Sequence, residues 1–535
     1  MDNLSYDVLI IGGGAAGCRA ALEAARAGKK IRVAIAVDGS FGTGGSSNLI
    51  ASEALGINAP FNFEDDGDTE DIYADDTVQT GGGLADPLLC RIIATESMNR
   101  LRELMELGVD FHTRHDHIWQ QKLSGCTKAR SLTCGGETGR AMVRVLRNEG
   151  VKHGVEILEN IKIVRLHRDE SGSVRGAYGI QNEKPVFVSA GAVILATGGA
   201  SALFSTNVTP LSQTGDGWAM AYDIGCNFVN MEFFQCGPAI VHNTMKFIIH
   251  SHMWRFLPKM TNGLGEEFLS RYCAGNTTPE KALDLKAMSY PFSVRTDAKY
   301  VDIGIFKEIA EGRGSLNGGV WIDVTHVSRD ELLKKAPVTY NTLLKAGIDL
   351  AKQPFEMTIA VQNFNGGVRI DENGFTGIDG LYAAGEVSGG VHGSDRPGGN
   401  NLTDTQVFGY RAGRAAAANC SQGCATGRPD VDLSSLMANE DEQKLIRESE
   451  KLYYRHLTVI RNRKGLEKVL AFIDEQEKSA VSAQLKNRLL VGRLLARAML
   501  AREESRGTHY REDFPGTNPD WVSRIVINKE GTIIG

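Results

Sequence analysis

Three glycines near the start of the chain have the types and spacing that bind a phosphate group. Gly12, Gly14 and Gly17 directly follow the aliphatic run of residues 8–11, and a helical pattern begins immediately after them. In such a signature the first glycine permits a tight turn, the second lets the backbone approach a pyrophosphate, and the third lets helix and strand pack closely. The free N–H groups at the helix start then face the phosphates. This order predicts a dinucleotide site and leaves FAD or NAD open; the alternative is a turn whose glycines serve packing alone.

Polar residues after the second aliphatic run extend this predicted site. Asp38 ends that run 21 residues after Gly17, and an acid at this distance usually binds the adenosine ribose. Residues 39–52 are rich in Gly and Ser, which suits a loop that wraps a cofactor with N–H and hydroxyl groups.

Three later stretches repeat the same design. Apolar runs end at residues 197–199 (Thr-Gly-Gly) and at residues 384–386 (Ala-Gly-Glu). Residues 398–402 (Gly-Gly-Asn-Asn-Leu) then open an alanine-rich helix, and the N-terminus of a helix favours an anion. Each stretch is a place where backbone can approach a ligand closely.

The remaining elements must bring these stretches together. With 535 residues the chain is too long for one core, and its 42% hydrophobic and 23% charged residues are ordinary for a globular enzyme. Apolar spacing predicts a helix from residue 86 and long charged helices over 435–505, with strands between 154 and 195. Residues 240–345 differ from their flanks in mixing aromatic and basic residues, and they are interpreted as an inserted domain. The acidic run over 62–76 is interpreted as a solvated surface loop.

Charge and cysteine content exclude several classes of function. A net charge of −6 argues against a nucleic-acid partner, and no apolar run reaches the ~20 residues of a membrane span. Because the first strand begins by residue 8, we expect no export leader and a cytoplasmic protein. The nine cysteines form no Cys-x-x-Cys pair, so we expect no metal or cluster site. Cys420 and Cys424 lie in a polar linker, where reduced thiols are favoured over a redox or metal role.

Seven motifs in order resemble one flavoprotein family. The motifs are GGGAAG, ATGG, TGDGWAMA, NGLGEEFLSRY, EGRGSLNGGVWIDVTH, GLYAAGEVSGGVHGSDRPGGNNL and AREESRGTHYREDFPG. Together they resemble the family of succinate dehydrogenase, fumarate reductase, L-aspartate oxidase and the α subunit of adenylylsulfate reductase. The resemblance covers nearly the whole chain, and this chain is similar to a diverged member.

This resemblance implies an α/β fold with three parts. A Rossmann-like FAD-binding domain would span residues 1–237 and 350–430, an inserted α+β capping domain 238–349, and a C-terminal helical domain 431–535. The cofactor would be FAD, bound non-covalently, because Ser40 is followed by Phe41 where quinone-linked members carry a histidine bonded to the flavin. The cofactor-binding residues that the resemblance and the glycine signature imply are Gly12, Gly14, Ala15, Ala16, Gly17, Asp38, Gly39, Ser40, Gly44, Gly45, Ser46, Ser47, Thr197, Gly198, Asp216, Glu386, Asn400, Asn401 and Leu402.

The resemblance also implies a carboxylate site. His392 and Arg396 match a family histidine and arginine that clamp one carboxylate, and arginine suits bidentate recognition of that group. Arg255 lies near the position of the proton-donating arginine, with His250 and His252 as alternatives. For His392 and Arg396 the alternatives are a satisfied buried histidine and a structural ion pair.

Three family motifs are altered in this chain. Dicarboxylate members have His-Pro-Thr after the Glu-Phe-x-Gln stretch, where this chain has Gly237 and Pro238. They have His-Tyr-x-Met-Gly-Gly before a later strand, where this chain begins with Gln362, which joins His392, Arg396 and Arg255 as a candidate catalytic residue. They also have an Arg-Gly-Glu-Gly segment ahead of Asn-x-x-Gly-Glu, which is replaced in residues 250–268 of this chain. One anion clamp is therefore missing, and fumarate, succinate and aspartate each need two.

The sequence thus predicts an FAD-dependent oxidoreductase that transfers hydride between flavin N5 and a small anionic substrate other than fumarate. Electrons would be exchanged with a separate iron–sulfur partner, unless the enzyme is an oxidase. The alternatives are a fumarate reductase or L-aspartate oxidase proper, and a flavin electron-transfer subunit without its own substrate site. The oligomeric state stays open.

Overall fold

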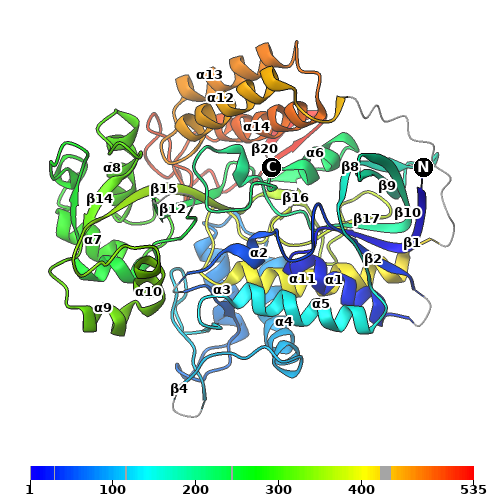
Figure 1. The fold of residues 1–535 in the computed structure, drawn as a ribbon, viewed down its shortest axis with the longest axis horizontal. Coiled ribbons are helices and arrows are strands. Elements are labelled where there is room, and N and C mark those ends of the chain that lie inside the picture. Colours follow the sequence, from blue (N-terminus) through cyan, green and yellow to red (C-terminus); the bar gives the residue numbers. More distant parts are fainter. Residues whose placement is uncertain are drawn as a thin grey trace.

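The structure is a computed structural model that describes residues 2–28, 31–52, 54–114, 117–241, 245–421 and 435–534. Three parts are visible in Figure 1: a sheet flanked by helices, a separate group of helices and strands formed by the middle of the chain, and helices from the end of the chain. Cys424 lies outside the described residues.

The central sheet belongs to the FAD-binding part. Its parallel strands have the order β7-β2-β1-β10, β17 pairs with β10 on the same sheet, and β9 and β8 extend it in antiparallel fashion. Strand β1 is flanked by apolar strands on both sides and has no exposure at its core positions, as a parallel strand requires. The strands are β1 (Asp2–Ile11), β2 (Val33–Ala36), β7 (Glu156–Leu158), β8 (Ile161–Arg168), β9 (Val174–Gln181), β10 (Lys184–Leu195) and β17 (Leu381–Ala383).

Helices from distant parts of the sequence cover one face of this sheet. Figure 1 shows α1, α11, α5 and α4 lying together below the strands. Helix α11 packs along α1, where Gly413 and Gly409 allow close approach because a Cβ at either would meet backbone of α1 within 3 Å. The helices of this part are α1 (Ala15–Arg26), α2 (Ser46–Leu49), α3 (Glu70–Thr80), α4 (Pro87–Glu106), α5 (Thr138–Lys152), α6 (Asp216–Asp223) and α11 (Asn400–Asn419).

The middle of the chain forms a cap that contains a second sheet. Its strands have the order β12-β15-β14-β13, all antiparallel. The chain enters the cap through β12 and leaves it through β15, and these two strands pair with each other. The elements are β12 (Phe234–Ile240), the 3-10 helix η2 (Ser251–Phe256), β13 (Lys259–Thr261), α7 (Pro279–Lys286), α8 (Lys299–Ala310), β14 (Val320–Asp323), α9 (Arg329–Lys335), α10 (Pro337–Lys345) and β15 (Phe355–Phe364).

The end of the chain packs back onto the FAD-binding part. Three helices form a group, α12 (Glu440–Leu457), α13 (Arg463–Gln476) and α14 (Ala483–Ala501), and α14 contacts α6. A strand pair that the sequence did not predict follows and extends a small sheet of order β18-β16-β11-β19-β20. Its strands are β11 (Phe228–Val229), β16 (Gly367–Arg369), β18 (Ser388–Gly389), β19 (Ile525–Asn528) and β20 (Gly531–Ile534).

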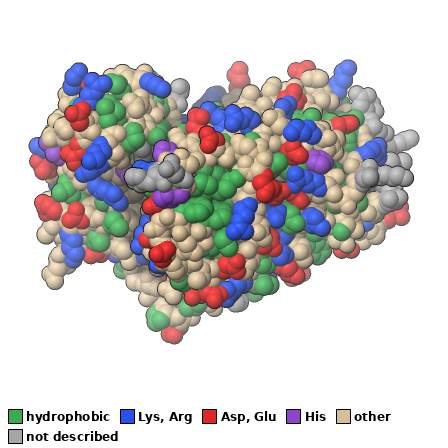
Figure 2. Space-filling model, turned by 90° about the horizontal axis from the view of Figure 1, so that it is seen from below, with side chains coloured by type: hydrophobic (Ala, Val, Ile, Leu, Met, Phe, Trp, Pro, Cys, Tyr) green, Lys and Arg blue, Asp and Glu red, His purple; other side chains and the backbone are tan. Residues whose placement is uncertain are grey.

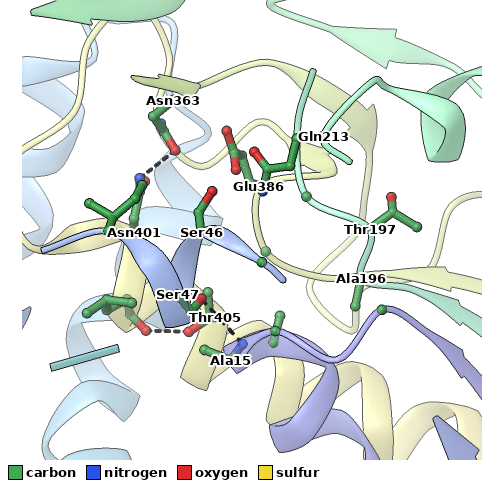
Figure 3. Close-up of a pocket in the computed structure, with 18 of the residues that line it drawn as sticks. Ala15, Ser46, Ser47, Ala196, Thr197, Gln213, Asn363, Glu386, Asn401 and Thr405 are labelled. Carbon is green, nitrogen blue, oxygen red and sulfur yellow. Dashed lines mark hydrogen bonds between the residues drawn. The ribbon is translucent and has the colours of Figure 1, made fainter. Parts of the chain in front are cut away.

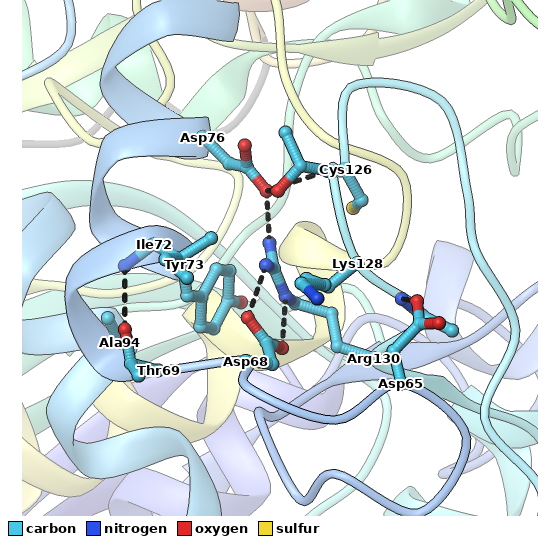
Figure 4. Close-up of polar contacts among 12 residues, drawn as sticks. Asp65, Asp68, Thr69, Ile72, Tyr73, Asp76, Ala94, Cys126, Lys128 and Arg130 are labelled. Atoms are coloured by element: carbon cyan, nitrogen blue, oxygen red, sulfur yellow. Dashed lines mark hydrogen bonds and ion pairs between the residues drawn. The ribbon is translucent and has the colours of Figure 1, made fainter.

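The prediction of a solvated acidic loop over 62–76 is wrong for Asp68 and Asp76, whose side chains are buried. Asp68 and Asp76 are buried at 4% and 7% exposure and hold the fully buried Arg130 between them. Figure 4 shows this cluster beside Tyr73, whose ring lies 4.8 Å from the guanidinium carbon. The sequence pattern failed because charges are buried when they are paired, and the partner lies far along the chain.

Surface charge is mixed on the face seen from below in Figure 2. Lys and Arg side chains are interspersed with Asp and Glu there, and hydrophobic side chains gather near the centre of the face. No helix in the part of the chain that the structure describes combines the length and apolar character that a membrane span needs.

Candidate active site

The glycine signature lies where the sequence predicts, between β1 and α1. Gly12 has a φ of +114°, which disfavours other residues, and a Cβ there would lie 2.3 Å from the carbonyl oxygen of Ala196. A Cβ on Gly17 would lie 2.0 Å from the carbonyl oxygen of Gly12. Only glycine therefore permits the tight turn that starts α1 at Ala15.

A long cavity begins at this turn and runs past the carboxyl ends of the parallel strands to the cap (Figure 3). Crevices at this end of a parallel sheet are where ligands bind in doubly wound folds. The structure brings together at this cavity most of the predicted cofactor residues, namely Gly12, Gly14, Ala15, Ala16, Asp38, Ser40, Gly44, Gly45, Ser46, Ser47, Thr197, Gly198, Asp216, Glu386, Asn401 and Leu402.

Several buried polar atoms on this wall have no hydrogen-bond partner among the described residues. They include the hydroxyl oxygens of Ser46 and Thr197 and the side-chain oxygen of Gln213. Leaving such a group unpaired costs about 1–3 kcal/mol, so they mark positions that polar groups of a ligand would satisfy. Figure 3 shows these residues, from separate segments, around one space. The wall therefore fits a cofactor with many oxygens and ring nitrogens, as FAD has.

Two acids on the wall are held by named contacts. Asp216 accepts hydrogen bonds from Thr214 and from Asn487 of α14, each at 2.8 Å, so the C-terminal helices help to form the cavity. Glu386 accepts one from the backbone N–H of Phe364 at 3.0 Å. Burial raises the pKa of Glu386 to about 7, against the backbone hydrogen bonds that lower it.

The first turn of α11 presents Asn401 and Leu402 to the cavity, while Asn400 turns away from it. The buried side chain of Asn400 accepts hydrogen bonds from Asn58 at 2.7 Å and Tyr73 at 2.9 Å and donates one to Thr77 at 3.1 Å, so this side chain is not available to the cofactor. It fixes the start of the helix against α3. Asn401 donates to Asn363 of β15 at 2.5 Å, a contact between the helix start and the last strand of the cap.

Four further predicted residues lie outside the cavity. Gly17 packs α1 on its strand, and the carbonyl of Gly39 accepts the N–H of Asn160. The ring of His392 is buried with its Nε2 3.4 Å from Asp404, which does line the cavity, and neither ring nitrogen has a hydrogen-bond partner among the described residues; its role as a carboxylate clamp stays a prediction. Arg255 is exposed on η2, because its side chain is turned outward while those of its neighbours Trp254 and Phe256 are buried.

Arg396 lines the cavity with its guanidinium group buried. Its Nε and Nη2 donate to the side-chain oxygen of Gln235 at 3.2 and 2.7 Å, and Nη1 donates to the carbonyl of Pro397 at 3.0 Å. The nearby Asp395 is already paired with Arg295 at 2.9 Å. Within the described residues no carboxylate forms an ion pair with Arg396, so the cavity has a buried cation without a counter-ion.

Beside Arg396 lies a neutral group of residues that the sequence alone did not bring together. Tyr290 donates to the side-chain oxygen of Gln362 at 2.7 Å, and the ring of His250 lies 4.7 Å from the ring of Tyr290. All three line the cavity. Burial lowers the pKa of His250 to about 3 and raises the pKa of Tyr290 well above its ordinary value, so both are neutral near pH 7. The sequence indicates His250 only as an alternative to Arg255 for proton transfer. No sequence motif identifies Tyr290 or Gln213 as a site residue.

A glycine-turn cavity with orphaned polar groups, next to a buried cation at a cap, has the features of a dinucleotide-binding site that adjoins an anion site. Residues 7–402 match the family model of an FAD binding domain, and residues 477–533 match that of the fumarate reductase flavoprotein C-term. The first match covers most of the chain. The chain therefore belongs to the FAD-dependent oxidoreductases of the fumarate reductase and succinate dehydrogenase flavoprotein family.

Individual relatives agree with this family. The chain is 34% identical to a subunit of the CoM/CoB fumarate reductase of Methanothermobacter marburgensis, over 98% of this chain and 97% of the relative. It is 32% identical to L-aspartate oxidase of Caulobacter vibrioides, over 97% and 95%. The solved structure of Mycobacterium smegmatis Sdh1 in complex with UQ1 superposes with a TM-score of 0.85 at 27% identity, covering 100% of this chain and 94% of that chain.

Proposed function

We propose that this FAD-dependent oxidoreductase exchanges hydride with a small anionic organic substrate bound between the FAD-binding part and the cap. Bound FAD supplies the hydride acceptor or donor at its N5 position. The observation that supports the anionic substrate is the buried guanidinium of Arg396, which lines the cavity without a counter-ion among the described residues.

Arg396 is oriented for this task before a substrate arrives. Gln235 receives two of its N–H groups and itself donates to Asp395 at 3.0 Å, so the guanidinium plane is fixed. A fixed planar donor fork binds a carboxylate in one orientation and places the adjacent carbon. The same charge polarises that carbon for hydride transfer.

The test replaces Arg396 with Gln and measures substrate-dependent oxidation or reduction of the bound flavin. We expect a rate loss of about 100-fold or more, as for other groups that stabilise a transition state electrostatically. Arg329→Gln, which removes an exposed arginine of α9, serves as the control and should retain the wild-type rate. Activity of the assembled complex that survives Arg396→Gln would favour the alternative, an electron-transfer subunit without a substrate site.

We propose that the cofactor-binding residues named above as lining the cavity hold FAD without a covalent bond. Phe41 lies on the wall next to Ser40, where the quinone-linked pattern would have a histidine. Acid precipitation of the holoenzyme should release the flavin into the supernatant. Flavin that stays with the precipitated protein would contradict non-covalent binding.

We further propose that the electrons are exchanged with a separate iron–sulfur protein. The relative from M. marburgensis is itself named as a subunit, which supports a partner for this chain. Purified protein with substrate and oxygen should then form little hydrogen peroxide. Rapid peroxide formation would favour an oxidase, and turnover of fumarate or aspartate at ordinary rates would favour the second alternative, an enzyme of those specificities.

A further inference from the structure

The place of Tyr290 in the cavity is set by a glycine. A Cβ built on Gly237 would lie 2.6 Å from the hydroxyl oxygen of Tyr290 and 2.7 Å from its Cζ. No side chain fits at position 237 while the phenol is there. Gly237 belongs to β12 and Gln362, the acceptor of the phenol, belongs to the paired strand β15. The phenol ring thus fills the space above the two strands through which the cap is attached.

The charges on the cavity wall are distributed unevenly. Apart from histidine, the cations among its lining residues are Lys162 and Arg396. Lys162 lies on β8 beside Ile161, whose N–H bonds to Val37 next to Asp38, at the end of the cavity where an adenosine ribose would bind. Among the described residues that line the cavity, Arg396 is therefore the one cation other than histidine near the cap.

Besides Gln362 and His250, the residues packed around Tyr290 are mostly apolar, and the buried Lys286, whose Nζ lies 5.9 Å from the ring centroid, is already paired with Asp302. The ring of Tyr290 packs in a small buried cluster with Val208, Ala239, Ile248 and Ala360, and Ile248 also lines the cavity. Gln362 offers a neutral amide, and the buried His250 is uncharged near pH 7. An anionic group placed against this wall would lose its hydration without gaining a cation, which is costly in a protein interior.

We propose that the substrate is a monocarboxylate, with its one carboxylate on Arg396 and an uncharged, largely apolar remainder against Tyr290, Gln362 and Ile248. This inference rests on the proposed function, since it uses the same cavity. It makes Tyr290 and Gln362 specificity-determining residues that exclude dicarboxylates.

A matched pair of ligands tests this directly. Crotonate and fumarate share the same trans carbon chain and differ in that crotonate has a methyl group where fumarate has its second carboxylate. Each is titrated into the wild-type holoenzyme while the visible absorption of the flavin is recorded. We expect crotonate to bind at least about tenfold more tightly than fumarate, because a buried unpaired group discriminates strongly between ligands.

Substitutions then connect the preference to the wall. Gln362→Arg introduces a permanent positive charge at this wall and should shift the crotonate-to-fumarate preference toward fumarate by about tenfold. Gln353→Arg makes the same change at an exposed glutamine outside the cavity and should leave the preference unchanged. Arg396→Gln should remove the binding of both ligands.

The outcomes separate this inference from the proposed function. If fumarate binds as tightly as crotonate or more tightly, and both depend on Arg396, the monocarboxylate inference is wrong and the anion site stands. If neither crotonate nor fumarate produces a response that depends on Arg396, both are wrong. The comparison of ligands on the wild-type protein needs no variant, so it holds even if a substitution prevents folding.

Discussion

The buried Arg130 offers a sharp test of how the structure is held together next to the helix start of α11. Its Nε and Nη2 donate to both oxygens of Asp68 at 2.9 and 2.7 Å, and Nη1 donates to Asp76 at 2.6 Å. Burial alone would lower the pKa of Arg130, but the hydrogen bonds that it donates to Asp68 and Asp76 raise it above its ordinary value. Arg130→Met keeps much of the volume and removes the charge.

The cost follows from what each acid retains. Asp76 also accepts hydrogen bonds from the N–H and the hydroxyl of Thr127, at 2.8 and 2.9 Å. The carboxylate of Asp68 has no second donor among the hydrogen bonds of the described residues. Removing one partner of a buried ion pair typically costs about 3–5 kcal/mol, so Arg130→Met should lower the free energy of unfolding by that amount. Most of this loss in the free energy of unfolding should come from the carboxylate of Asp68, which would be left buried without a partner.

Asparagine substitutions in the Arg130→Met background separate the two acids. Asp68→Asn should restore about 1–3 kcal/mol because it removes an unpaired buried charge, and Asp76→Asn should restore less. The measurement is urea-induced unfolding of the holoenzyme, followed by fluorescence. A loss below about 1 kcal/mol in Arg130→Met, or equal recovery by both asparagines, would refute the assignment of Asp68 as the dependent partner.

Three further predictions concern the cofactor cavity. Gly17→Ala should lower FAD affinity by about ten- to a hundredfold, because the added Cβ would overlap the carbonyl oxygen of Gly12. In the control Gly28→Ala the added Cβ has no neighbour closer than 3.5 Å, so FAD affinity should not change. Titration of the two apoproteins with FAD compares these affinities. Burial raises the pKa of Glu386 from 4.5 to about 7 in the folded protein, so between these pH values the unfolded apoprotein binds fewer protons than the folded one. The free energy of unfolding of the apoprotein should therefore fall by about 3 kcal/mol as the pH rises from 4.5 to 7. Denaturation of Glu386→Gln should lack this slope, and a slope identical to that of the wild type would contradict the prediction. Thr197→Val should weaken FAD binding about tenfold if its unpaired hydroxyl meets the cofactor, and unaltered FAD dissociation would show that it does not.

Features that depend on local spacing were predictable from the sequence. The turn at Gly12, the strand before it and the helix after it are set by neighbouring residues, and so is the alanine-rich helix that begins at Asn400. Three-part organisation followed from the order of motifs, and family membership and the FAD cofactor agree with the comparisons.

Features that depend on distant partners were not predictable. Gly237, Tyr290 and Gln362 meet only because β12 and β15 pair after the cap has been formed between them. No local pattern distinguishes the side of η2 that carries Arg255 outward.

The role of His392 stays a prediction for a related reason. The motif placed it within four residues of Arg396, but the turn between them directs one side chain into the cavity and the other against Asp404. The spacing in the sequence predicts that the two residues lie close together, but the direction of the backbone at each residue decides which side chain enters the cavity.

The way the cavity is assembled has a consequence for how the protein is made. Its lining runs from Ile11 to Thr405, and Asp216 on that lining is held by Asn487 of α14. During synthesis from the N-terminus, the glycine turn leaves the ribosome long before α11 and α14 exist. Cofactor insertion therefore belongs to the end of biogenesis, and the cellular supply of FAD acts on a nearly complete chain rather than on its first domain.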